Sequence, residues 1–125
     1  MSEQWLDSKE IKKALVEDGW RSPDTYDNFY CTAPLSPAVY LFLLHDVEKE
    51  FYSKALVAYV GMSVQLACRW HGHEILNEIS VPGYWPMRWF KPTPERKLRQ
   101  VERKYIQKFD PAWNVIGRTR GVALQ

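Results

Sequence analysis

A cation, an imidazole and a carboxylate stand out in this sequence because of where the surrounding pattern puts them. Arg69 and His73 follow the short apolar stretch that ends at Gly61, and they are four residues apart. On a helix, that spacing puts both side chains on one face. Glu102 lies within an apolar row of helical period, where a carboxylate needs a partner or a function. Together the three side chains indicate a site for a phosphate group and a metal ion.

The composition limits the kinds of protein that can carry this site. A chain of 125 residues has the size of one domain, and 46% hydrophobic with 14% aromatic residues argues against disorder. The formal net charge is only +2, so any surface for nucleic acid must come from local clustering of cations. The sequence shows no leading apolar run, no segment of membrane-spanning length and only two cysteines. We therefore expect a reduced, cytoplasmic protein that does not enter a membrane.

Residues 1–36 read as an N-terminal extension that packs on the main domain, residues 37–125. Ser8 can cap a short amphipathic helix over residues 9–18, with Gly19 as its stop. The following segment is rich in Pro, Asp, Asn and Ser, which is typical of a loop.

The main domain reads as an α+β fold. Three segments have strand composition, at residues 39–44, 55–60 and 87–91. Two segments have helical patterns: residues 64–79, capped by Ser63, and residues 94–109, capped by Thr93. Residues 81–86 read as a rigid aromatic loop. The order predicts a three-stranded antiparallel sheet flanked by helices.

Two short motifs face each other in the predicted hairpin: Ala38-Val39-Tyr40 and Tyr59-Val60-Gly61. Arg69 lies eight residues beyond Gly61, and His73 lies four residues further. Two later residues complete the ordered set, Glu102 on the last helix and Asn114 after a proline-containing turn.

This set resembles the GIY-YIG nuclease family, and the resemblance covers about residues 37–116. Ala38 stands where the first family motif has a glycine, and the hairpin loop is longer than is usual in the family.

The resemblance implies a DNA endonuclease that hydrolyses phosphodiester bonds with one metal ion. Glu102 would hold one Mg²⁺ or Mn²⁺, and Arg69 would contact the scissile phosphate. Tyr40 would be the general base, which requires positive charge from Arg69 and the metal to lower a pKa that is ordinarily about 10. Tyr59 would orient water or phosphate, and His73 would relay the proton or bind phosphate. Gly61 and Asn114 would support the site.

A DNA substrate also needs a binding surface. Cations and aromatic rings on the last helix and around residues 84–91 are suited to holding a nucleic-acid backbone and stacking on unpaired bases. The residues that we expect there are Trp85, Arg88, Lys91, Arg99 and Arg103. The sequence leaves open whether one copy or a homodimer acts.

Each residue also has an ordinary interpretation. Tyr40 and Tyr59 can be strand core residues, the basic helix can be a solvated face, and Glu102 can form a salt bridge with Arg69 or Arg99. A zinc site built from Cys68, His71 and His73 matches no common ligand spacing. For the whole chain, the alternative is a nucleic-acid-binding or protein-interaction module on the same scaffold that cuts weakly or not at all.

Overall fold

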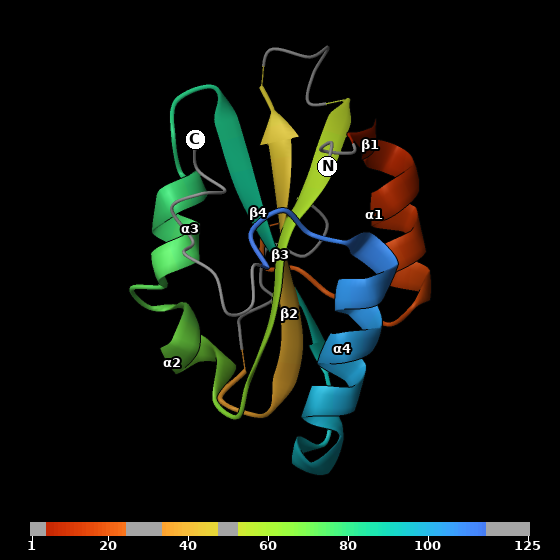
Figure 1. The fold of residues 1–125 in the computed structure, drawn as a ribbon, viewed down its shortest axis with the longest axis vertical. Coiled ribbons are helices and arrows are strands. Elements are labelled where there is room, and N and C mark those ends of the chain that lie inside the picture. The colour runs from red at the N-terminus through yellow and green to blue at the C-terminus, as the bar shows by residue number, and fades with distance from the viewer. Residues whose placement is uncertain (1–4, 25–33, 48–52, 115–125) are drawn as a thin grey trace.

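The structure is a computed structural model that describes residues 5–24, 34–47 and 53–114. Its elements in chain order are β1 (Leu6–Asp7), α1 (Ser8–Glu17), β2 (Ala38–Asp46), β3 (Lys54–Ser63), α2 (Leu66–Trp70), α3 (Glu74–Ile79), β4 (Tyr84–Pro92), the 3₁₀ turn η2 (Glu95–Lys97) and α4 (Leu98–Phe109). Figure 1 shows β2, β3 and β4 running along the long axis of the molecule. Within the described residues, no helix has the length and apolar character needed to cross a membrane.

The α+β class and the antiparallel pairing are confirmed, but the sheet has four strands rather than the predicted three. The strand order is β1-β3-β2-β4, and every neighbouring pair is antiparallel. The additional strand is β1, where Leu6 pairs with Ala55 and Asp7 pairs with Lys54. A two-residue strand shows no alternation of apolar and polar residues, so the sequence pattern does not reveal it.

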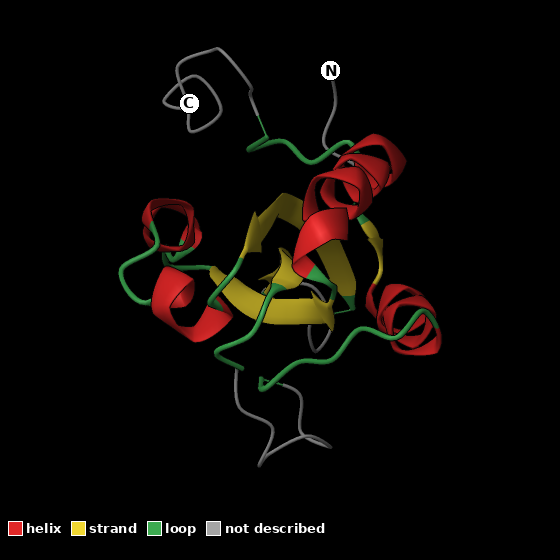
Figure 2. Cartoon of the chain, turned by 90° about the horizontal axis from the view of Figure 1, so that it is seen from below, coloured by secondary structure: helices red, strands yellow, loops and turns green. Residues whose placement is uncertain are grey.

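Two apolar layers cover the two faces of the sheet. On one face, α1 and α4 pack over Val39, Leu41 and Leu43. On the other face, α2 and α3 pack over Tyr40 and Phe42. Figures 1 and 2 show these helix pairs on opposite sides of the strands. Because both faces are covered, β2 is buried from Ala38 to His45 and reads as a continuous apolar run.

The described part of the N-terminal extension belongs to this core. Ile11 and Leu15 of α1 and the following Trp20 are buried in the same cluster as Leu98 of α4. The hydroxyl of Tyr105 donates a hydrogen bond to the carboxylate of Asp18, which joins α4 to the end of α1. The expected loop of the extension falls partly on residues 25–33, which lie outside the described residues.

The predicted helix over residues 64–79 is wrong, because the chain forms two short helices there. Gly72 has a φ of 69°, a left-handed conformation that ends α2 and that glycine adopts without strain. His73 then caps α3, with its Nδ1 atom accepting a hydrogen bond from the Ile75 N–H. Arg69 and His73 therefore do not share one helix.

Three local predictions also need correction. Residues 84–86 form the start of β4 rather than a loop, because they pair with β2 from Leu44 to Asp46. Thr93 does not cap a helix, since its hydroxyl donates to the Lys91 carbonyl. Ser63 belongs to the end of β3, and its hydroxyl accepts a hydrogen bond from the Gln65 N–H.

His45 makes the stability of this fold sensitive to acid. The side chain is fully buried in β2, and burial together with the charge of Lys12 lowers its pKa to about 4 from 6.5. Below about pH 6.5 the unfolded chain takes up a proton on this imidazole that the folded chain does not take up until about pH 4. We expect about 3 kcal/mol of stability to be lost across this window as the pH falls.

Urea unfolding, followed by tryptophan fluorescence across this pH range, measures the loss. His45→Gln keeps a donor for the Trp85 carbonyl but cannot titrate, so its stability should depend less on pH. His71→Gln is the matched control, because His71 is exposed. Equal pH slopes for His45→Gln and the wild type would contradict this assignment.

Candidate active site

Tyr40 lies at the centre of the candidate site, and Gly61 makes room for it. The two residues are directly opposite each other in the β2–β3 pair, so they share one face of the sheet. A Cβ atom on Gly61 would lie 2.6 Å from both Cζ and Oη of Tyr40, and 2.8 Å from Cε2 of Tyr59. The ring of Tyr40 therefore lies across the strand at the one position that has no side chain.

Gly61→Ala should consequently damage both fold and site. The added methyl group must displace the Tyr40 ring, which is only 1% exposed. We expect a loss of about 1–3 kcal/mol in the free energy of unfolding, together with loss of any activity that needs the Tyr40 hydroxyl. Urea unfolding and an activity assay on the same preparation check both effects. Wild-type values in both would show that Tyr40 is not held as described.

His73 holds the hydroxyl of Tyr40. Its Nε2 atom lies 2.8 Å from Tyr40 Oη, and its Nδ1 atom accepts a hydrogen bond of 3.1 Å from the Ile75 N–H. Because Nδ1 is an acceptor, the proton of the neutral imidazole is on Nε2, which donates to the Tyr40 oxygen. His73 is 1% exposed, so of its two expected roles phosphate contact does not fit its position. Its geometry instead orients Tyr40.

Tyr59 joins this group from β3, next to an irregularity in that strand. Phe42 is opposite Tyr59 while Leu43 is opposite Val57, so Ala58 is an extra residue in β3. The rings of Tyr40 and Tyr59 lie with their centroids 6.1 Å apart, and Tyr59 is half-buried. Because Tyr59 is two residues from Gly61 in a regular stretch of β3, strand alternation puts it on the same face as Tyr40, with its ring nearer to solvent.

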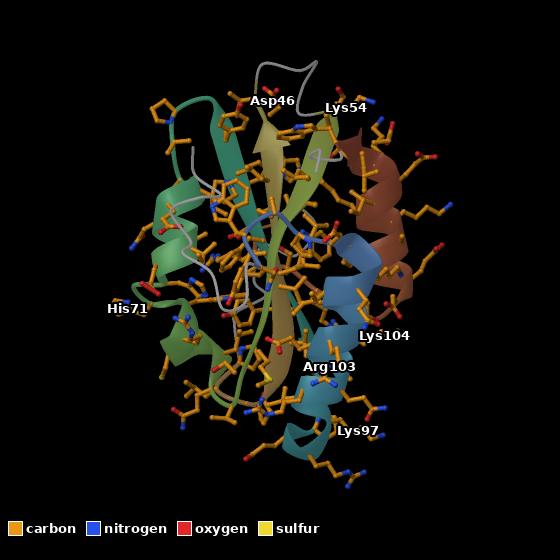
Figure 3. The ribbon with its side chains drawn as sticks, in the orientation of Figure 1. Asp46, Lys54, His71, Lys97, Arg103 and Lys104 are labelled. Carbon is orange, nitrogen blue, oxygen red and sulfur yellow. The ribbon has the colours of Figure 1, made fainter. Side chains whose placement is uncertain are left out.

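Arg69 and Glu102, on two different helices, both influence the pKa of the Tyr40 hydroxyl. The positive charge of Arg69, on α2, lowers the pKa of Tyr40, and the negative charge of Glu102, on α4, raises it. These helices cover opposite faces of the sheet, and β3 runs between them (Figure 1). Arg103 beside Glu102 on α4, and His71 after α2, lie on either side of β3 in Figure 3. The two charges thus come from helices on opposite faces of the sheet.

Neither charge is neutralised by an ion pair in the part of the chain that the structure describes. The ion pairs there join Arg88 to Asp24 and Lys91 to Asp18. Arg69 is exposed and Glu102 is half-buried. The alternative in which Glu102 is paired with Arg69 or Arg99 is therefore not what these residues form.

The environment of Glu102 suits a bound cation. Burial raises the pKa of its carboxyl group, and the nearby charges of Arg99 and Arg103 oppose that effect. A bound cation would compensate the charge that burial penalises. No group of three His, Cys, Asp or Glu side chains able to hold a metal occurs among the described residues. In that region, a metal at Glu102 would have one carboxylate ligand with water in its remaining positions, as Mg²⁺ commonly does.

The electrostatics of Tyr40 differ from the expected ones. Burial is the largest influence on its pKa and raises it above the ordinary value of 10.0, while a hydrogen bond with Tyr59 raises it further. Arg69 acts in the opposite direction, as expected, but does not overcome burial. Tyr40 is therefore a neutral phenol at physiological pH unless additional positive charge comes close.

Asn114 braces the edge of β3, which agrees with its expected supporting role. Its Oδ1 atom accepts from the Val60 N–H at 2.8 Å, and its Nδ2 atom donates to the Val60 carbonyl at 2.7 Å. The Trp113 N–H also donates to the Ala58 carbonyl at 3.0 Å. Because β1 pairs only with the start of β3, these bonds satisfy backbone groups that no neighbouring strand reaches in the described structure.

Two cations that we expected to bind substrate are used inside the protein. Arg88 makes hydrogen bonds of 2.7 and 2.9 Å to the Asp24 carboxylate, and its guanidinium lies 5.1 Å from the ring centroid of Trp70. Lys91 donates to the Asp18 carbonyl and lies 3.7 Å from the Asp18 carboxylate. Both cations anchor the segment after α1 to β4, so this expectation needs correction.

The other three expected contacts divide between two places. Trp85 is 38% exposed and pairs with His45, at the far end of β2 from the Tyr40 hydroxyl. Arg99 and Arg103 are exposed on α4 beside Glu102. Of the predicted substrate-binding residues, the structure thus brings only these two arginines to the candidate site.

Two aromatic residues at the site were not predicted. The ring of Trp70 meets Tyr40 edge-on at 6.0 Å, and Phe42 meets His73 edge-on at 5.0 Å. Phe42 follows Tyr40 by two residues in β2, so strand alternation could have placed both on one face. These rings fix the orientations of the polar groups.

The zinc alternative does not match this geometry. His73 is committed to Tyr40 and Ile75, and Cys68 and His71 are exposed, with no ligand cluster among the described residues. Comparisons with protein-family models, with curated proteins and with solved structures each found no match to this chain. The argument for function therefore depends on the site itself.

Proposed function

We propose that this chain is a metal-dependent DNA endonuclease of the GIY-YIG type, which hydrolyses phosphodiester bonds with one metal ion. The observation that carries the proposal is the convergence on the Tyr40 hydroxyl. His73, at the α3 cap, lies within hydrogen-bond distance of this oxygen, and the pKa of the hydroxyl responds to groups on β3, α2 and α4: Tyr59, Arg69 and Glu102. Phosphodiester hydrolysis needs an oriented water, cationic stabilisation of the phosphate and a carboxylate for a metal. The set supports each need.

Arg69 and Glu102 supply the charges. The exposed guanidinium of Arg69 is available to bind two oxygens of the scissile phosphate at once. The carboxylate of Glu102 would hold Mg²⁺ or Mn²⁺, which when bound supplies Lewis-acid stabilisation of charge on the phosphate. Arg99 would hold a flanking phosphate of the DNA strand, and Arg103 would contact the DNA beside it.

Tyr40 and its neighbours would orient the attacking water and accept its proton. The donation from His73 Nε2–H directs one lone pair of Tyr40 Oη, which leaves the second lone pair to receive a hydrogen bond from water. The same donation stabilises the phenolate oxygen if Tyr40 loses its proton. Tyr59, half-buried beside it, orients the water from the solvent side. Tyr40 then acts as a base only when substrate and cation are both in place.

The buried, neutral state of Tyr40 favours one other candidate. Its low exposure and raised pKa are also those of a core tyrosine. A nucleic-acid-binding or protein-interaction module on this scaffold, weakly active or inactive, would show the same hydrogen bond to His73. Only an activity measurement separates the two.

The test uses supercoiled plasmid and branched oligonucleotides as substrates, in Mg²⁺, Mn²⁺ or EDTA. We expect the wild type to nick at least one substrate in either metal and none in EDTA, and Glu102→Ala to be inactive. If the wild type leaves every substrate intact, the binding-module candidate replaces the nuclease. Equal cutting by wild type and Glu102→Ala would show that the reaction does not occur at this site.

A further inference from the structure

A row of four polar side chains faces away from the core along η2 and α4. Gln100, Arg103 and Gln107 of α4 are spaced three and four residues apart, which puts them on one helical face, and Arg96 precedes them in the 3₁₀ turn η2 that leads into α4. All four are exposed, and none has a hydrogen bond or an ion pair within the part of the chain that the structure describes. We call these four residues the arginine–glutamine row. It has no structural partner in the described fold.

The charge around this row is one-sided. Residues 95–108 contain six cations, Arg96, Lys97, Arg99, Arg103, Lys104 and Lys108, and only two acids, Glu95 and Glu102. The opposite face of the helix is fixed to the core by Leu98 and Tyr105. Figure 3 shows Lys97, Arg103 and Lys104 around the outer surface of α4. A polyanion is the complementary partner for this face.

We propose that α4 inserts the arginine–glutamine row into the major groove of duplex DNA and reads base edges there, an inference that rests on the proposed nuclease function and names its substrate as a duplex. Arginine pairs in bidentate fashion with guanine, and glutamine does so with adenine. An α-helix with its side chains is about 10–12 Å across, close to the major-groove width of about 12 Å. Lys97, Lys104 and Lys108 then meet backbone phosphates.

The chemistry of the arginine–glutamine row favours duplex DNA over other polyanions. Charge alone would attract any of them, but two neutral glutamines at helical spacing among the cations are suited to hydrogen bonds with base edges. A single strand would need exposed rings for stacking. The rings on α4 do not provide them, because Tyr105 is buried and Phe109 is half-buried. The Nζ atoms of Lys104 and Lys108 also lie over the Tyr105 ring, at 5.2 and 5.8 Å from its centroid.

The first experiment asks whether the protein prefers any sequence. Glu102→Gln protein, which should bind without cutting, is used to select duplexes randomised over about one helical turn. We expect a preferred sequence with guanine and adenine at the selected positions. Enrichment of no sequence would overturn the inference, while cleavage by the wild type would still support the nuclease.

The second experiment compares two double variants in the Glu102→Gln background, by fluorescence anisotropy with the selected and a scrambled duplex at several salt concentrations. Gln100→Ala/Gln107→Ala should reduce the preference for the selected duplex at least about 10-fold, without changing the salt dependence. Lys104→Ala/Lys108→Ala should weaken both duplexes equally and lower the salt slope by about 2. All four positions are exposed in a helix, where alanine is well tolerated.

The groove is identified by modified bases. Replacing the selected purines with 7-deaza analogues removes only a major-groove acceptor. Protein that keeps the arginine–glutamine row should lose its preference for the selected sequence on these duplexes. The Gln100→Ala/Gln107→Ala variant, whose preference is already reduced, should show little further loss. Unchanged binding of 7-deaza duplexes, or unchanged preference in the glutamine variant, would overturn the inference. If the protein selects a duplex but the wild type never cuts DNA, the assignment of α4 to the major groove stands and the proposed nuclease function is rejected.

Discussion

Glu102→Gln is expected to lower the rate of DNA cleavage by at least about 10³-fold without unfolding the protein. The amide has the shape of the carboxylate but lacks the charge that would hold a metal ion. Burial already raises the pKa of this carboxyl group, so removing its charge should leave thermal stability unchanged or slightly higher. The measurement is a single-turnover cleavage rate in Mg²⁺, with a melting curve on the same sample.

Glu95→Gln is the matched control for this prediction. Glu95 is exposed in η2, within the same basic segment of the chain, and its loss changes the net charge equally. It should cut like the wild type. Wild-type cutting by Glu102→Gln, or equal losses in both variants, would show that Glu102 is not the metal ligand.

Tyr40→Phe is expected to lower the same rate by about 10²–10⁴-fold, the usual contribution of a proton-transferring group. The variant also leaves His73 Nε2–H without its acceptor, which costs about 1–3 kcal/mol of stability. Because the pKa of Tyr40 is raised, its phenolate fraction grows tenfold per pH unit through the neutral and moderately alkaline range. The wild-type rate should rise over this range, and the residual rate of Tyr40→Phe should not.

Tyr105→Phe separates this effect from the general cost of losing a buried phenol. Tyr105 is also 1% exposed, its pKa is raised to about 12, and its hydroxyl donates to Asp18 on the opposite face of the sheet. It should lose stability but keep both the rate and its pH dependence. Equal rate losses in the two variants would mean that Tyr40 acts only through the fold.

The sequence was most informative where the spacing of apolar residues along one segment indicates how deeply that segment is buried. The continuous apolar run at residues 39–44 predicted a strand, and these residues form the buried part of β2 between the two core layers. The inward row of α4 marked Glu102 as an unusual carboxylate, and its side chain is indeed half-buried. These features follow from short-range periodicity.

Predictions failed where contacts between distant residues decide the outcome. Arg88 and Lys91 have the composition of a binding surface, but Asp24 and Asp18 neutralise them from 64 and 73 residues away. β1 becomes a strand only because β3 offers it an edge. The predicted helix over residues 64–79 runs through Gly72, whose positive φ, which ends α2, is a property of the tertiary path.

The sequence named the members of the candidate site but not their electrostatics. The ordered motifs pointed to Tyr40, Gly61 and Asn114, and the structure gives each a specific contact. The spacing of Arg69 and His73 suggested one helical face, whereas two short helices bring them to Tyr40 by separate routes. The burial that dominates the pKa of Tyr40 could not be derived from spacing.

The most direct test of convergence on Tyr40 is the single-turnover cleavage rate of the double variant Tyr40→Phe/Glu102→Gln. If both residues serve one reacting centre, the double variant should cut about as slowly as the slower single variant, because residues that act as a unit give non-additive losses. A double variant whose rate loss equals the product of the two single losses would contradict a shared centre.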